Sequence, residues 1–172
     1  MGKPDPALLF DVVAARVLDA MKLASEALAA ANVRHVVVGG LAVGANGYPR
    51  ATKDVDFLVG AEAFHHHASG LVTMRPDVPF QVNSVAVDLL SPEPGEDFLE
   101  ATLATAAGTI MEAPPLVYLK LKSPRRKDHV DVIEMIKGGI DTARCRAYLA
   151  AHAPAFVAAF DECVAQADAE QD

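Results

Sequence analysis

The sequence has little cysteine and no tryptophan: Cys145 and Cys163 are the two cysteines in 172 residues. Both lie in segments with the residue pattern of a helix, and we expect them to be buried helix residues. Two cysteines do not indicate a disulfide framework. The longest uncharged stretch near the middle, 35–49, is far shorter than the ~20 apolar residues of a membrane-spanning helix. The N-terminus lacks the basic-then-apolar order of a secretory signal. We therefore expect a cytoplasmic protein with no membrane partner.

Basic residues are also scarce, 15 against 23 acidic ones, which gives a net charge of −8. Broad coating of nucleic acid is disfavoured, because phosphate binding needs a basic face. A small basic site for a nucleotide or an RNA end stays open, since five cations fall within eight residues. They are Lys120, Lys122, Arg125, Arg126 and Lys127. The 52% apolar and 22% charged composition is that of an ordinary globular protein.

Apolar spacing predicts an α/β chain. The expected strands are 33–38, 54–59 and 85–90, with an irregular strand within 71–82. The expected helices are 6–31, 41–46, 61–69, 96–106, 115–122, 125–137, 142–152 and 154–167, and 168–172 is expected to be a frayed tail. Ser123 and Pro124 suit an N-cap and a first helical residue. We expect a single domain over 1–172: a small mixed β-sheet flanked by helices at about 30–110, and a helical C-terminal region at about 111–170.

Three aspartates stand out because they lie on predicted strands. Alternate side chains on a strand share a face, so Asp54 and Asp56 point the same way. Asp88 lies on the face opposite Val85 and Val87, where a lone acid is costly unless it is paired. If the two strands are neighbours, three carboxylates converge, which is typical of two-metal phosphoryl or nucleotidyl transfer. The alternative is that these acids merely face water.

Gly39 and Gly40 lie at a predicted strand-to-helix turn. Glycine lets a phosphate approach the backbone, and free N–H groups at a helix start favour anions. The spacing to Gly44 and Gly47 excludes the dinucleotide-binding pattern G-x-G-x-x-G, and no Lys-Ser/Thr follows Gly44, which excludes a Walker-type loop. A plain tight turn is the alternative.

The run His65-His66-His67 looks like a set of metal ligands. Consecutive positions on a helix diverge by ~100° each, so on the predicted helix 61–69 the three rings would not converge. A solvated segment is the favoured interpretation, and the role of these histidines stays open.

Taken together, the runs 38–40, 50–59 and 87–89 resemble the nucleotidyltransferase superfamily with the DNA-polymerase-β-like fold. The Arg-x-Thr-x-Asp-x-Asp form is most similar to small stand-alone prokaryotic members, including the abortive-infection (AbiE-type) toxin group. The runs 119–123 and 126–131 are similar to the Lys and Arg/Lys-Asp-x-x-Asp motifs of those proteins. The resemblance extends over about residues 33–135.

The resemblance implies a role for each matching residue. Nucleotide binding falls to Gly39, Gly40, Arg50, Thr52 and Lys53; Mg²⁺ or Mn²⁺ binding falls to Asp54, Asp56 and Asp88; and these three act in catalysis with Lys120. Lys120 is expected to reach the three acids and neutralise phosphate charge. Lys122 faces elsewhere on the helix. Asp128 and Asp131 either support that site or serve the helix, since Lys127 and Asp131 suit an ordinary i, i+4 ion pair.

The resemblance also implies a reaction: transfer of a nucleoside monophosphate from an NTP to a hydroxyl. The acceptor is left open among a tRNA end, a protein and a small molecule. A toxin of a toxin–antitoxin or phage-defence system fits, with a cognate antitoxin as partner. Two alternatives are a non-catalytic, antitoxin-type regulatory partner with the same fold and a generic α/β small-molecule binder.

Overall fold

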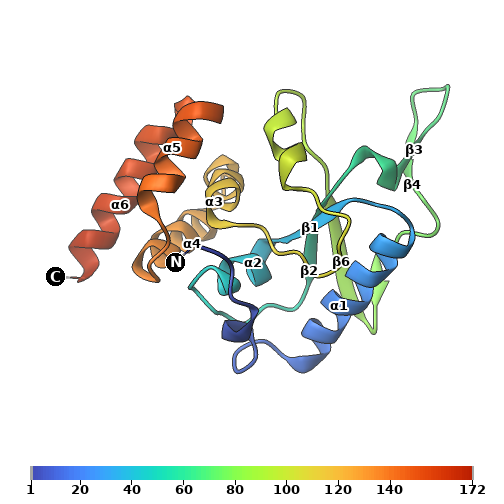
Figure 1. The fold of residues 1–172 in the computed structure, drawn as a ribbon, viewed down its shortest axis with the longest axis horizontal. Coiled ribbons are helices and arrows are strands. Elements are labelled where there is room, and N and C mark those ends of the chain that lie inside the picture. Colours follow the sequence, from blue (N-terminus) through green and yellow to red (C-terminus); the bar gives the residue numbers. More distant parts are fainter. Residues whose placement is uncertain (1, 172) are drawn as a thin grey trace. The chain divides into compact units, whose positions relative to one another are not determined.

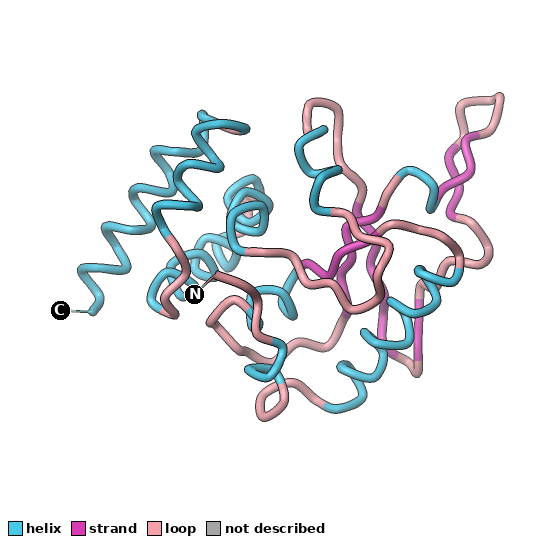
Figure 2. Tube along the Cα trace, viewed as in Figure 1, coloured by secondary structure: helices cyan, strands magenta, loops and turns pink. Residues whose placement is uncertain are grey.

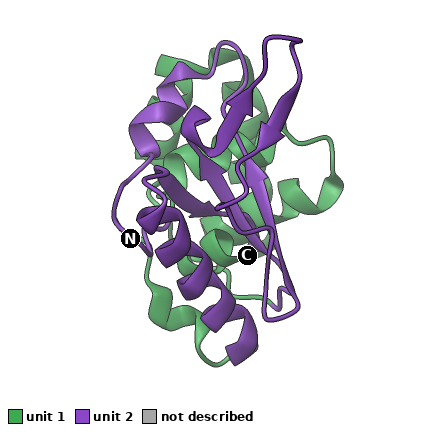
Figure 3. Ribbon diagram, turned by 90° about the vertical axis from the view of Figure 1, so that its right-hand side faces the viewer, with its two compact units in different colours: residues 1–12, 41–50, 111–172 green, residues 13–40, 51–110 purple. Residues whose placement is uncertain are grey.

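The structure, a computed structural model, describes residues 2–171 and divides the chain into two compact units (Figure 3). Unit 1 takes residues 1–12, 41–50 and 111–172, and unit 2 takes residues 13–40 and 51–110. The units interleave along the sequence, and the last crossing, between residues 110 and 111, falls at the expected start of the helical C-terminal region. The single domain expected over 1–172 stays a prediction.

Unit 2 contains a small mixed sheet built from β1 (His35–Val38), β2 (Val55–Val59), β5 (Gln81–Val82) and β6 (Val85–Leu90) (Figure 1). The strand order is β1-β2-β6-β5. β2 pairs antiparallel with β1 and parallel with β6, and β5 pairs antiparallel with β6. The expected small mixed sheet of an α/β chain is thus confirmed, and so are the three main strands.

Helix α1 (Ala15–Ala30) covers one face of this sheet and packs against all four strands. Ser25 of α1 lies 2.7 Å from His35 of β1, which identifies the face that α1 covers. Because side chains alternate, the next positions along the strands point to the other face. In β6 the alternation is plain: Val85 and Val87 are buried, whereas Asp88 is exposed. The acidic positions therefore lie on the face turned away from α1.

The rest of unit 2 differs most from the sequence prediction. Residues 61–69 form no α-helix: a 3₁₀ turn η2 (Ala61–Ala63) leads into a hairpin of β3 (Phe64–His66) and β4 (Val72–Met74), drawn in magenta in Figure 2. The helix expected at 96–106 is also wrong, because only the 3₁₀ segment η3 (Asp97–Thr102) forms there. Each short segment gets its hydrogen bonds from a turn or a partner strand, which local propensity does not encode.

Unit 1 is helical, as expected for the C-terminal region (Figure 2). Its elements are η1 (Pro6–Leu9), most of α2 (Gly39–Ala45), α3 (Ala113–Lys122), α4 (Arg126–Lys137), α5 (Thr142–His152), η4 (Pro154–Phe156) and α6 (Val157–Gln171). α3 packs on α4 and α5, and α6 packs on α4 and α5. Helix α6 continues to Gln171, so the frayed tail predicted from 168 is wrong up to there; Asp172 lies outside the described residues.

Three helix boundaries also need correction. The helix predicted over 6–31 is two elements, because Asp5 caps the short η1 and the chain turns before α1 starts at Ala15. Helix α2 begins at the glycines and not after them. Ser123 is the C-cap of α3 and not the N-cap of the next helix, since α4 begins at Arg126 and the Ser123 hydroxyl bonds to Asp128.

Candidate functional site

The sheet of unit 2 brings two of the three predicted aspartates side by side. In the parallel ladder between β2 and β6, Asp56 is the register partner of Asp88. Register partners on adjacent strands share a face and lie about 4.8 Å apart along the hydrogen-bonding direction. Asp54 stands two residues before Asp56, just ahead of β2. Asp88 is exposed, and Asp54 and Asp56 are partly exposed, so solvent reaches these acids.

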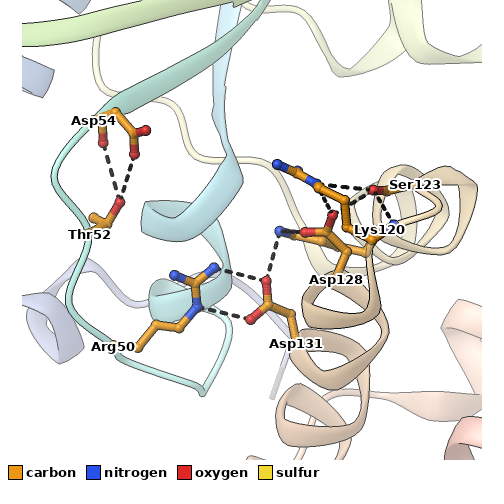
Figure 4. A network of polar contacts seen from close by, with 8 residues as sticks. Arg50, Thr52, Asp54, Lys120, Ser123, Asp128 and Asp131 are labelled. Carbon is orange, nitrogen blue, oxygen red and sulfur yellow. Dashed lines mark hydrogen bonds and ion pairs between the residues drawn. The ribbon is translucent and has the colours of Figure 1, made fainter.

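Thr52 acts on one of these carboxylates. Its hydroxyl donates to Asp54 Oδ1 at 3.1 Å (Figure 4). This bond fixes the orientation of the Asp54 carboxylate within the loop before β2. The predicted role of Thr52 in nucleotide binding stays a prediction; the contact that the structure shows is this hydrogen bond to Asp54. Lys53, between them, is exposed.

Gly39 lies against the Asp56 carboxylate. β1 ends at Val38, the register partner of Asp56, and Gly39 follows with φ +63°, in the left-handed region. A Cβ at position 39 would lie 2.0 Å from Asp56 Oδ2, which no real side chain tolerates. Backbone conformation and space both require glycine here. The predicted glycine turn therefore lies beside Asp56; Gly40, next to it, is buried.

The five cations of residues 120–127 lie in unit 1. Among them, Lys120 is bound by two carboxylates (Figure 4). Its Nζ donates to Asp128 Oδ1 and to Asp131 Oδ2, each at 2.8 Å. Arg50 binds the same Asp131 with two parallel bonds, from Nε and Nη2, each 2.9 Å long. This planar two-point contact is the geometry that guanidinium and carboxylate favour. The pair joins α4 to the segment that follows α2.

Asp128 has the most donors in this network. The Ser123 hydroxyl donates to its Oδ2 at 2.6 Å, and Arg125 Nε donates to the same oxygen at 2.7 Å. Burial by itself would raise the pKa of Asp128, but the bonds from Lys120, Ser123 and Arg125 outweigh burial and hold this pKa at about 2. Asp128 is therefore a charged, fully bonded buried group.

These contacts change how the basic residues are interpreted. The Arg50 pKa is raised, first by its hydrogen bond to Asp131. The ion pair expected between Lys127 and Asp131 is wrong, because Asp131 pairs with Arg50 and Lys120. The expected approach of Lys120 to the three acids, and the nucleotide-binding roles of Lys120 and Arg50, stay predictions.

The remaining candidate residues are the two cysteines and the histidine run 65–67. Cys145 and Cys163 are buried, as expected, and burial raises the pKa of Cys145 to about 12, so its thiol is unreactive. His65 and His66 lie on β3 and His67 follows it, so the argument from helical geometry does not apply to them.

Sequence reasoning missed one buried polar chain in unit 2. The Gly108 N–H donates to Ser25 Oγ at 2.7 Å, and Ser25 Oγ lies 2.7 Å from His35 Nε2. His35 Nδ1 lies 2.8 Å from the Val33 carbonyl, which only accepts, so Nδ1 carries the proton and Ser25 donates to Nε2. Burial lowers the pKa of His35, which keeps it neutral. The signal was a histidine within a β-branched run, and its role is structural.

Across residues 2–171, no group of three or more His, Cys, Asp or Glu side chains is arranged to hold a metal ion. The metal role of Asp54, Asp56 and Asp88 thus stays a prediction. No helix in the same residues has the length and apolar character needed to cross a membrane.

The chain was compared with family models, curated proteins and solved structures. No family model matches the chain, and no curated protein matches it. Among solved structures, the chain is similar to an antigenic nucleotidyltransferase-like protein from Paracoccidioides brasiliensis. The identity is 13%, the match covers 94% of this chain and 95% of that chain, and the TM-score is 0.42. A likeness this distant establishes neither a family nor an activity.

Proposed function

We propose that this protein transfers a nucleoside monophosphate from an NTP to a hydroxyl acceptor in a Mg²⁺-dependent reaction. The observation that carries the proposal is the parallel register that sets Asp56 beside Asp88, with Gly39 against the Asp56 carboxylate. Like charges on directly adjacent strand positions repel. A sheet that keeps two acids in this arrangement, partly open to solvent, is suited to binding a cation.

The donor set fits a hard divalent ion. Carboxylate oxygens are the protein ligands that Mg²⁺ prefers, and it keeps several waters besides one or two of them. Asp56 and Asp88 would supply these ligands, with Asp54 as the third, and Mn²⁺ would bind the same oxygens. When bound, the ion would supply charge neutralisation at the phosphates.

The chain's own residues then have distinct tasks. The hydrogen bond from Thr52 holds the Asp54 carboxylate in one orientation before any ligand arrives. The missing side chain at Gly39 makes room for the Asp56 carboxylate directly beside the turn that follows β1. Asp88 is exposed and has the chemistry to accept the proton of an incoming hydroxyl. Nucleotide binding by Gly40, Arg50, Lys53 and Lys120 rests on the sequence resemblance alone.

The net charge of the chain limits which acceptors are favoured. A chain with a net charge of −8 offers little attraction to a large RNA, so a short RNA end, a protein hydroxyl or a small molecule is favoured. A toxin role, with a cognate antitoxin, belongs to the same proposal. The competing function is a non-catalytic regulatory partner, which would keep the fold without transferring a nucleotide.

The test is label transfer. The purified protein is incubated with each α-labelled NTP, Mg²⁺ or Mn²⁺, and separate pools of tRNA, protein and small metabolites. We expect labelled acceptor and released pyrophosphate with wild type and neither with Asp56→Asn. Asp19→Asn, which removes an exposed acid of α1, is the matched control and should keep full activity. Nucleotide binding without transfer in every pool would favour the regulatory partner.

A further inference from the structure

The hairpin of unit 2 presents histidines that the proposed transfer does not use. β3 and β4 pair antiparallel, with His65 opposite Thr73 and His66 opposite Val72. Opposite residues on adjacent strands share a face, so His65 and Thr73 lie on one face and His66 on the other. All three histidines are exposed, and Figure 1 shows the hairpin extending beyond the four-stranded sheet of the same unit.

His67 belongs to the face of His65. The His67 N–H donates to the Leu71 carbonyl at 2.8 Å, so the pairing of the two strands continues to this residue. Its ring Nε2 lies 2.8 Å from Thr73 Oγ1, and Thr73 is the partner of His65. One face of the hairpin thus carries two imidazoles at i and i+2, about 6–7 Å apart along the strand.

Thr73 gives this pair a feature common in metal sites. Metal-bound histidine usually has its other ring nitrogen hydrogen-bonded to a neighbouring polar group, which fixes the ring. In the tautomer in which Nε2–H donates to Thr73 Oγ1, the lone pair is on Nδ1, and this nitrogen would coordinate the ion.

We propose that His65 and His67 form a binding site for a first-row transition dication such as Zn²⁺ or Ni²⁺. Imidazole nitrogen suits these ions, whereas Mg²⁺ prefers oxygen. The site would have two protein ligands, with water in the remaining positions. It is separate in its residues and its chemistry from the carboxylates of β2 and β6, and it does not depend on the proposed transfer.

The test is titration of the 172-residue protein with ZnCl₂ and with NiCl₂ at pH 7.5, followed by calorimetry. We expect one saturable site in wild type that excess Mg²⁺ does not displace. His65→Asn and His67→Asn should each weaken the affinity by at least about tenfold, and Thr73→Val by about tenfold through loss of the outer contact. His66→Asn is the matched control: it removes a neighbouring histidine that is also exposed but lies on the opposite face, and it should leave the affinity unchanged.

Two outcomes would overturn the proposal. Equal losses in His66→Asn and His67→Asn would show a general affinity of the histidine run and no defined face. Unchanged Zn²⁺ affinity in the double variant His65→Asn/His67→Asn would place the ion elsewhere. Wild type also allows a test without variants, because imidazole must be neutral to coordinate. Binding should weaken strongly at pH 5.5, and pH-independent binding would contradict the imidazole ligands.

Discussion

Two pairs of aspartates, one on the sheet of unit 2 and one on α4 of unit 1, differ in burial. The carboxylates on α4 are buried and bound by cations, whereas those on the sheet are reached by solvent. Asp128 and Asp131 have side chains 1% and 4% exposed, and both bind the Lys120 ammonium. Asp88 is exposed on β6 beside Asp56, and no hydrogen bond or ion pair to Asp88 occurs among residues 2–171. One pair of carboxylates is matched by cations of the chain. In the other pair, Asp88 has the Asp56 carboxylate as its register partner.

From this difference we expect the pair on α4 to stabilise the fold and the pair on the sheet to bind a cation. A buried charge loses several kcal/mol of hydration, which only close partners offset, so the α4 network is committed to holding α3, α4 and Arg50 together. An exposed carboxylate keeps its hydration and contributes little to stability. Asp88 therefore retains the capacity to bind a cation from solution. Substitutions should divide the two pairs between stability and function.

The largest effect is expected from Asp128→Ala. The substitution leaves the buried Lys120 with one carboxylate fewer and removes the acceptor of Ser123 and Arg125. Breaking one side of a buried ion network costs about 3–5 kcal/mol. Urea unfolding followed by circular dichroism measures this loss, with Asp88→Ala as the exposed counterpart. A loss below about 1 kcal/mol for Asp128→Ala would show that the network does not hold unit 1 together.

The sheet was well predicted where burial alternates along the strand. The pattern of β6, with Val85 and Val87 inward and Asp88 outward, follows directly from the order of apolar and polar residues. The same alternation predicted that Asp54 and Asp56 share a face. Which strand lies next to β2, and in which register, depends on pairing between distant segments, so the juxtaposition of Asp56 and Asp88 required the structure.

Two failures have related causes. His65 to His67 were assigned to a helix, because local propensity does not include the partner strand β4 that makes this segment a hairpin. The basic cluster was found, but its pairing was not: Arg50 meets Asp131 across 81 residues of sequence. Helical spacing suggested Lys127 as the partner of Asp131 instead. Contacts set by helix packing cannot be obtained from spacing along one helix.

Low pH should remove the contribution of Asp128 to the free energy of unfolding, with a smaller effect than the Asp128→Ala substitution. The folded pKa of Asp128, about 2, lies below its ordinary value of 3.8, so the unfolded chain binds this proton more readily. The stability from Asp128 is therefore present in full above about pH 4 and is lost as the pH falls through about 2. The urea unfolding midpoints of wild type and Asp128→Asn, measured between pH 2 and 7, should differ at neutral pH and approach each other as the pH falls toward 2. Parallel curves would contradict the depressed pKa.

The smallest effect on folding is expected from Asp88→Asn. The change keeps the shape of the side chain and removes one of two adjacent like charges, so the free energy of unfolding should stay the same or rise by up to about 0.5 kcal/mol. Any gain should shrink at high salt, which screens exposed charges. Mg²⁺ at millimolar concentration should raise the melting temperature of wild type through preferential binding to the folded state, and should do so less in Asp88→Asn. Thermal melts of both proteins, with and without Mg²⁺ and NTP, measure the two effects together. A loss of more than about 1 kcal/mol in the metal-free variant would make Asp88 a structural acceptor like Asp128, and the distinction between the two pairs of carboxylates would fail.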